Sequence, residues 1–304
     1  MVARALEERA RAVAVPAGLG PSRRSRLWHS YRCDPAALAG TAILVTAVLV
    51  AVFAPYVAGN NPELQDLSRR LQPPTWVVGP RFLGTDSLGR DIFDHIVYGL
   101  RVSLLVGLLS IAISAGLGVS SGIVSGFFRG RLDALLMRAA DMQLSLPNLL
   151  VALAAAAIWG RGVFKLIVVI GIVGWAEYAR TVRGSTLALQ EHEFVEAARA
   201  LGASDLRIMR HHLLPHVLTP VIVLISVSIP RVIVLEATLS FLGLGVPLTT
   251  PSLGSMIDNG YRYLFSGAWW PSIMPGMALM ILIMSINLVG DWLRDALDPH
   301  LHRV

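Results

Sequence analysis

The chain has 304 residues, of which 54% are hydrophobic and only 15% are charged, with a formal net charge of +6. Soluble globular domains carry about a quarter charged residues, so this composition excludes that class. It is typical of a protein that crosses a membrane several times through apolar runs of about 20 residues.

The first predicted element is a polar, basic tail over residues 1–37, which contains seven arginines. The tail has no apolar core of its own, so it is not a cleavable signal peptide. The positive-inside rule predicts that it stays on the cytoplasmic side of the membrane. Cys33 is the single cysteine of the chain, which excludes an intrachain disulfide.

The remainder, residues 38–304, is predicted to be one transmembrane domain, so the fold class is an all-α polytopic membrane protein. Runs of apolar residues predict six transmembrane helices. Their approximate bounds are 38–58, 102–128, 138–159, 166–180, 217–235 and 272–290. With the first residue inside, the predicted cytoplasmic segments hold most of the arginines, so both termini are expected in the cytoplasm of a bacterial inner or plasma membrane.

A polar segment rich in small residues, 190–216, lies between the fourth and fifth predicted spans. Helix-forming residues lead up to Gly202, which is suited to the left-handed conformation that ends a helix. Ser204 or Asp205 is placed to cap a second short helix, and Pro215 marks the entry to the next span. The pattern predicts two helices separated by a glycine.

Small side chains next to Glu196 predict that the first of these helices is a docking surface. Ala197 and Ala198 leave room for the backbone of another protein to approach closely. The alternative is a solvated linker, which needs neither an alanine face nor a defined turn.

Charged residues near the apolar runs are candidates for structural pairs or for a transport pathway, because a charge in lipid is costly. Asp141 with Arg138, and Glu177 with Arg180, have the i,i+3 spacing of pairs on one helix face.

Arg231 and Glu236 are five residues apart, about 140° around a helix, so they are not expected to pair. One or both are predicted to face the pathway and meet the termini of a zwitterionic peptide, the alternative being a bond to a partner subunit. The candidate pathway or gate residues are Arg231, Glu236, Phe241 and Asp141.

Two groups of residues suggest metal binding at first sight, and we expect neither to be a metal site. His212 and His216 have the i,i+4 spacing of zinc ligands, but basic residues at the entrance of a span are the simpler interpretation. Asp91, Asp94 and His95 share one helical face, and a structural role or contact with a binding protein is expected there.

Four separated motifs resemble one family of membrane proteins. The segment EAARALGASDLRIMRHHLLP, Glu196–Pro215, is similar to the cytoplasmic EAA loop of ATP-binding-cassette importer permeases, whose coupling helix fits a groove on an ATPase subunit. The resemblance implies that nine residues couple the chain to the ATPase: Glu196, Ala197, Ala198, Leu201, Gly202, Ala203, Ile208, Leu214 and Pro215. Phe82–Leu104, Glu236–Ile257 and Asn287–Leu301 resemble the signatures of the dipeptide, oligopeptide and nickel permeases. The residues around the first span resemble those of the C-type subunit.

This resemblance implies a type I ABC importer architecture and a set of partners. The expected partners are a B-type permease, two ATPase subunits and an extracytoplasmic peptide-binding protein, and membrane lipid surrounds the chain. The expected function is import of di- or oligopeptides through half of a translocation pathway, with nickel import as the alternative within the same family. No nucleic-acid partner is expected.

The chain itself is predicted to be non-catalytic and to need no cofactor. A P-loop requires a lysine after glycine that reaches the phosphates, and the only lysine, Lys165, follows Phe164. The alternative to a transporter subunit is a membrane-embedded enzyme, but no predicted span carries a nucleophile–histidine or two-aspartate arrangement. ATP and Mg²⁺ are therefore expected on the partner ATPases.

Overall fold

The structure is a computed structural model and describes residues 31–58, 65–75, 81–247 and 249–297. Most of the predicted basic tail and the end of the last signature motif therefore lie outside the described residues. Within the described ranges the chain is helical, and β-pairing is limited to an isolated bridge between Thr85 and Asp91.

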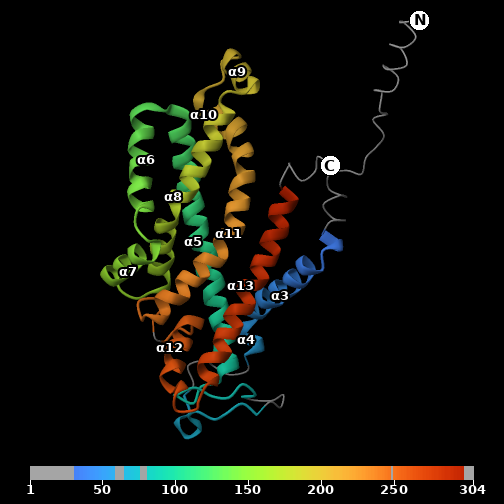
Figure 1. Cartoon of the computed structure of the whole chain (residues 1–304), viewed down its shortest axis with the longest axis vertical. Helices are drawn as coiled ribbons and strands as arrows, with labels where there is room; N and C mark the ends of the chain where they lie inside the picture. Colours follow the sequence, from blue (N-terminus) through green and yellow to red (C-terminus); the bar gives the residue numbers. More distant parts are fainter. Residues whose placement is uncertain (1–30, 59–64, 76–80, 248, 298–304) are drawn as a thin grey trace, which may run out of the picture.

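The helices follow one another along the chain and lie largely side by side (Figure 1). In order they are α3 (Pro35–Val52), α4 (Ala54–Val57), α5 (Ile92–Phe128), α6 (Gly130–Leu144), α7 (Asn148–Trp159), α8 (Val163–Leu189), α9 (Glu193–Ala200), α10 (Asp205–Arg207), α11 (Leu214–Phe241), α12 (Leu253–Leu264) and α13 (Trp270–Leu297). A 3-10 turn, Leu67–Arg69, lies in the loop before α5, and a π-helical segment, Ile208–Leu213, joins α10 to α11.

Four helical units of the described chain are long and apolar enough to cross a membrane. They are α3, α5, the continuous unit Asp205–Phe241 and α13. The bent pair α6 and α7 makes a fifth if it counts as one span. α8 is long enough to cross but carries Lys165, Glu177, Arg180 and Arg183.

The predicted third span, 138–159, is not one continuous helix. The chain forms α6 and α7 instead, and their axes differ by 92° across Ser145–Pro147. Pro147 explains the break, because proline lacks the N–H of a helical hydrogen bond and disfavours the helical conformation of the residue before it.

The second short helix expected after Gly202 is continuous with the fifth span. Helical structure continues from Asp205 into α11, and the expected cap residue Ser204 stands at the N-cap position without a side-chain hydrogen bond. The π-helical segment ends just before Pro215. A wider turn of this kind accommodates a proline that has no N–H for the normal ladder and would clash with the carbonyl four residues earlier.

Other boundaries differ because helices extend past the apolar run that predicts them. α5 begins at Ile92 rather than near residue 102, and Asp91 caps it by accepting a hydrogen bond from the N–H of Phe93 at 2.8 Å. Its 37 residues correspond to about 55 Å. This length exceeds the hydrocarbon core of about 30 Å, so part of α5 lies outside it.

The closest helix packing is between α5 and α8, where glycines allow the backbones to approach. A Cβ added to Gly122 would lie 2.6 Å from the carbonyl oxygen of Ala179, and one added to Gly126 would lie 2.8 Å from Cβ of Thr186. Ser114 also donates a hydrogen bond of 2.8 Å to the carbonyl of Gly171 across this interface. Small residues and interhelical hydrogen bonds hold helices together in membranes, where lipid competes with apolar contacts.

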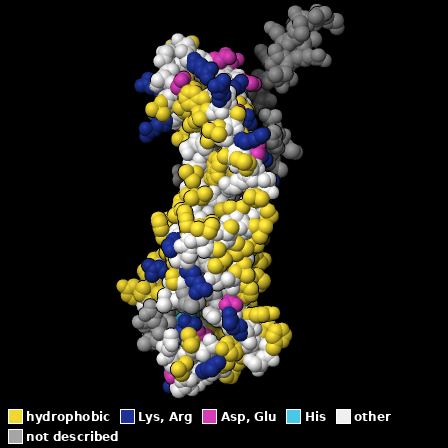
Figure 2. Space-filling model, turned by 90° about the vertical axis from the view of Figure 1, so that its left-hand side faces the viewer, with side chains coloured by type: hydrophobic (Ala, Val, Ile, Leu, Met, Phe, Trp, Pro, Cys, Tyr) yellow, Lys and Arg dark blue, Asp and Glu magenta, His cyan; other side chains and the backbone are white. Residues whose placement is uncertain are grey.

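The two ends of the molecule carry different structures. α9 lies at one end, and α12 with the loop before α5 lies at the other (Figure 1). α3 begins and α13 ends on the side toward α9. Figure 2 shows charged side chains gathered around the α9 end, a largely hydrophobic band below them, and further charges toward the opposite end.

Candidate functional site

The segment between α8 and α11 forms the predicted helix and glycine turn. Gly202 follows α9 with a φ of +77°, in the left-handed region where glycine is preferred. The N–H of Ala203 donates to the carbonyl of Ala198, and the N–H of Gly202 donates to that of Arg199. These two bonds define a Schellman motif and confirm the predicted helix end at Gly202.

The inner side of α9 is packed against its own chain. Val195 and Ala198 are buried together with Ile208, Leu213 and Phe127, the last of which belongs to the end of α5. Ala198 and Ile208 are therefore not open to a partner, and the predicted alanine face is wrong in this respect. The reason is that α9 uses these small and branched side chains to dock on α5 and the π-helical segment.

The outer side of this loop is exposed and partly apolar. Leu201 is 88% exposed and Leu206 is 70% exposed, on either side of Gly202. Glu196 and Ala197 are also exposed, whereas Ala203 and Leu214 are partly buried and Pro215 is exposed. The loop therefore presents two large apolar side chains to its surroundings next to the glycine turn.

Two histidines, His192 before α9 and His216 in α11, stack on the ring of Phe194. The ring centroid of Phe194 lies 5.1 Å from that of His216 and 5.8 Å from that of His192. Nδ1 of His216 also lies 2.7 Å from the carbonyl oxygen of His212. Among the described residues, no group of three or more His, Cys, Asp or Glu side chains is arranged to hold a metal ion.

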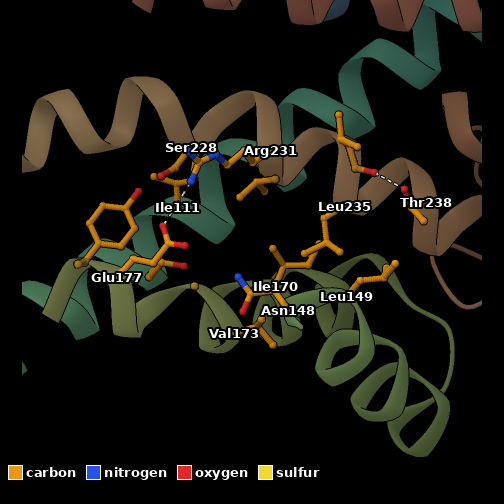
Figure 3. A pocket seen from close by; sticks show the side chains of 15 residues that line it. Ile111, Asn148, Leu149, Ile170, Val173, Glu177, Ser228, Arg231, Leu235 and Thr238 are labelled. Carbon is orange, nitrogen blue, oxygen red and sulfur yellow. Dashed lines mark hydrogen bonds and ion pairs between the residues drawn. The ribbon is translucent and has the colours of Figure 1, made fainter. Parts of the chain in front are cut away.

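A cavity of about 280 Å³ lies between α5, α7, α8 and α11. Arg231 from α11 reaches toward Glu177 from α8, with 3.7 Å between Nη1 and Oε2, as Figure 3 shows. Ser228 and Asn148 contribute polar groups from α11 and α7. The cavity therefore contains both a cation and an anion within the helical bundle.

The ion pairs differ from those that the sequence spacing predicts. Glu177 pairs with Arg231 rather than with Arg180, and Arg180 pairs with Asp141 across α8 and α6. Asp141 is accordingly not paired with Arg138 and does not line the cavity. In both pairs the two side chains belong to different helices. Sequence spacing within one helix does not predict such contacts.

Glu236 and Arg231 do not pair, which confirms that part of the prediction. Glu236 is fully buried and accepts hydrogen bonds from Ser103 on α5 at 2.9 Å and from Ser240 at 2.8 Å. It does not line the cavity that contains Arg231. Its contacts join α5 to the end of α11.

Phe241 lines a second cavity of about 660 Å³ at the end of the molecule opposite α9. Arg161, Asp258 and Arg262 also line it, and the ring of Phe241 lies 6.4 Å from that of Tyr261 on α12. The two candidate pathway residues Arg231 and Phe241 thus lie in separate cavities along α11.

The fold and these cavities define a multi-pass helical membrane protein, the class to which transport permeases belong. Residues 118–303 match the model of the binding-protein-dependent transport system inner membrane component, and residues 22–74 match the N-terminal transmembrane domain of oligopeptide transport permease C. The chain belongs to this family of ATP-binding-cassette transporter permeases.

Similar proteins cover almost the whole chain. The di/tripeptide transport system permease protein DppC of Pseudomonas aeruginosa is 39% identical over 94% of this chain and 95% of that protein. The dipeptide permease DppC of Bacillus subtilis is 36% identical over 91% and 85%, and the probable D,D-dipeptide permease DdpC of Escherichia coli is 37% identical over 90% and 91%.

A solved structure supports the fold. A chain of the MetNI methionine ABC transporter, in inward-facing conformations, aligns with a TM-score of 0.52 and 22% identity. The alignment covers 66% of this chain and 96% of that chain. At this identity, the likeness applies to the fold alone.

Sequence reasoning missed Glu177, Tyr178 and Asn148 as residues of the central cavity. Glu177 carried a usable signal, because it is an acid within an otherwise apolar run. Tyr178 and Asn148 carried none, since a tyrosine or an asparagine near a helix end has many structural roles. Their position depends on how α7 and α8 pack.

Proposed function

We propose that this chain is the C-type permease subunit of an ATP-driven importer of di- or oligopeptides and forms half of the translocation pathway. The observation that carries this proposal is the docking loop, with its rigid Schellman turn and exposed Leu201 and Leu206. The relatives, which include di/tripeptide, peptide and D,D-dipeptide transport permeases, support peptide as the substrate. They favour it over the nickel alternative.

The proposed topology has six transmembrane segments and both termini in the cytoplasm. It counts α8 and the bent pair α6 and α7 as two segments in addition to the four apolar units. The first span, α3, begins and the last span, α13, ends on the side of α9, which supports this arrangement (Figure 1). α9 is then cytoplasmic, and α12 faces the outside.

The proposed partners are a B-type permease, two ATPase subunits and an extracytoplasmic peptide-binding protein. The chain contains one lysine, and it is not part of a P-loop, so ATP and Mg²⁺ would be held by the ATPases. The nine loop residues have two proposed roles. Exposed Glu196, Ala197, Leu201 and Gly202 would contact the ATPase, while buried members fix the angle of α9.

The proposed mechanism is alternating access. Closure of the ATPase pair moves α9, and the movement reaches the bundle because Val195 and Ala198 are packed against the end of α5. α8 and α11 flank this loop and also form two walls of the central cavity. A ligand shifts such an equilibrium only by its differential affinity for the two states.

Two substitutions in the loop test the proposal in a transporter assembled with its partners. Gly202→Pro cannot adopt a φ of +77°, and Glu196→Arg reverses an exposed charge on α9. Both should abolish peptide-stimulated ATPase activity without blocking insertion into the membrane. Normal stimulation in both variants would exclude the loop as the coupling site, and stimulation by Ni²⁺ but by no peptide would overturn the peptide assignment.

A further inference from the structure

The charge pair in the cavity between α5, α7, α8 and α11 lies well inside the length of α11, away from its ends. Arg231 precedes Phe241, the last residue of α11, by ten positions, which corresponds to about 15 Å of helix. This is about half of a hydrocarbon core of about 30 Å. Ionisable residues at this depth are costly and generally serve a transport pathway or a ligand.

The geometry of this pair leaves both groups free to bind something else. The distance of 3.7 Å exceeds the range of a normal hydrogen bond, and the side chains of Arg231 and Glu177 are 65% and 37% exposed. By contrast, Arg183 and Asp133 form a closed fork with distances of 2.6 and 2.7 Å. The Arg231–Glu177 pair therefore has unused donors and acceptors that face the cavity.

A third polar group in the cavity is also unused. The hydroxyl of Tyr178 is buried and has no hydrogen-bond partner among the described residues. Ser228 on α11 lies beside it, yet no hydrogen bond of normal geometry joins the two. A buried hydroxyl without a partner is costly, and a ligand with a peptide group would satisfy it.

The other walls of the cavity are mostly apolar. Ile111, Leu149, Ile170, Val173 and Leu235 line it. Its volume of about 280 Å³ is near the lower end of small-molecule sites, which range over about 300–1,000 Å³. A small ligand with one positive end, one negative end and a variable apolar body matches these walls.

We propose that this cavity binds the two charged ends of a short zwitterionic peptide, with Arg231 holding the carboxylate and Glu177 holding the ammonium group. The inference rests on the proposed transport function and names the residues that recognise the substrate. The Arg231–Glu177 pair separates when the peptide binds. Arg231 then binds the peptide carboxylate in place of the Glu177 carboxylate, and Glu177 binds the peptide ammonium group in place of the Arg231 guanidinium. The Tyr178 hydroxyl bonds a backbone amide, and the apolar walls admit side chains without selecting them.

A thiol-protection experiment tests the site without involving the binding protein. Cys33 is the only cysteine of the chain, so Cys33→Ser combined with Thr238→Cys leaves one thiol, at the wall of the cavity. The assembled permease–ATPase complex in lipid nanodiscs is labelled with a methanethiosulfonate reagent. Alanyl-alanine should slow labelling of this chain, whereas N-acetyl-alanyl-alanine amide, which has no charged ends, should not.

Variants then identify the charged partners. Arg231→Gln and Glu177→Gln should each raise the half-protecting concentration of alanyl-alanine on the order of tenfold or more. Arg69→Gln is the matched control, because Arg69 pairs with Asp66 in the loop before α5, outside the cavity. Asn148→Cys, on another wall, replaces Thr238→Cys if that variant does not fold, and exposed Ser266→Cys should label equally with and without peptide.

The outcomes separate this inference from the proposed function. Uptake of alanyl-alanine by the complete transporter, combined with no protection or with equal protection by the blocked peptide, would overturn the binding site alone. Unchanged half-protecting concentrations in Arg231→Gln and Glu177→Gln would do the same. Absence of any peptide uptake by the wild-type transporter would overturn the proposed function itself.

Discussion

The guanidinium of Arg199 on α9 lies over the ring of Phe127 at the end of α5, with 5.4 Å between Cζ and the ring centroid. This contact joins α9 to α5, next to the buried side chains of Val195 and Ala198. A rigid connection at this position is what a movement of α9 needs in order to reach the bundle.

Arg199→Ala should reduce the amount of peptide transported per ATP hydrolysed while leaving membrane insertion intact. A cation–π contact of this kind contributes about 0.5–1 kcal/mol, so α9 would be held less firmly on Phe127. The measurement is simultaneous peptide uptake and phosphate release in proteoliposomes. Arg207→Ala, at an exposed arginine of α10, is the control, and equal coupling ratios in the two variants would contradict the prediction.

Gly122→Leu should prevent assembly of a stable transporter, because the added Cβ would lie 2.6 Å from the carbonyl oxygen of Ala179. Overpacking of a tight interface costs about 1–3 kcal/mol or more, and two backbones have little room to move apart. Gly116→Leu is the matched control on the same helix, since nothing lies within 4 Å of a Cβ there. Yield and thermal stability of the detergent-solubilised protein provide the test; similar values for both variants would refute this account of the α5–α8 contact.

Asp133→Asn should destabilise the protein more than Asp141→Asn. Asp133 accepts two hydrogen bonds from Arg183 in a fork, and their side chains are 15% and 33% exposed. Loss of such a partly buried charge-assisted pair costs about 1–3 kcal/mol. Asp141 and its partner Arg180 are both 57% exposed, so the loss there is below about 1 kcal/mol. Thermal unfolding monitored by circular dichroism compares the two, and the reverse order would disprove the prediction.

Glu236→Ala should lower stability without changing the selectivity of the transporter for peptides. The substitution leaves the buried hydroxyls of Ser103 and Ser240 without their acceptor, at a cost of about 1–3 kcal/mol. Glu236→Gln keeps one oxygen that can accept a bond and should lose less. Competition between peptides of different charge measures selectivity, and an altered preference in Glu236→Gln would place this residue in the pathway after all.

The class of protein and the end of α9 at Gly202 could both be predicted from the sequence alone. Apolar runs of about 20 residues have the length needed to cross a hydrocarbon core, so membrane-spanning helices can be predicted without a structure. Gly202 was readable for a local reason, because a helix end in the left-handed conformation favours glycine whatever surrounds it. The resemblance of four motifs also predicted the family that the comparisons confirm.

The pairing of the charged side chains and the exposure of the loop residues depend on tertiary packing and could not be predicted from the sequence. Glu177 lies three residues from Arg180 in the sequence, yet it pairs with Arg231 because α8 and α11 pack side by side. The small side chain of Ala198 was expected on a docking face, but it is buried against other residues of the same chain. Local rules act over one or two helical turns, whereas these contacts join residues tens of positions apart, and their distances depend on how the helices pack.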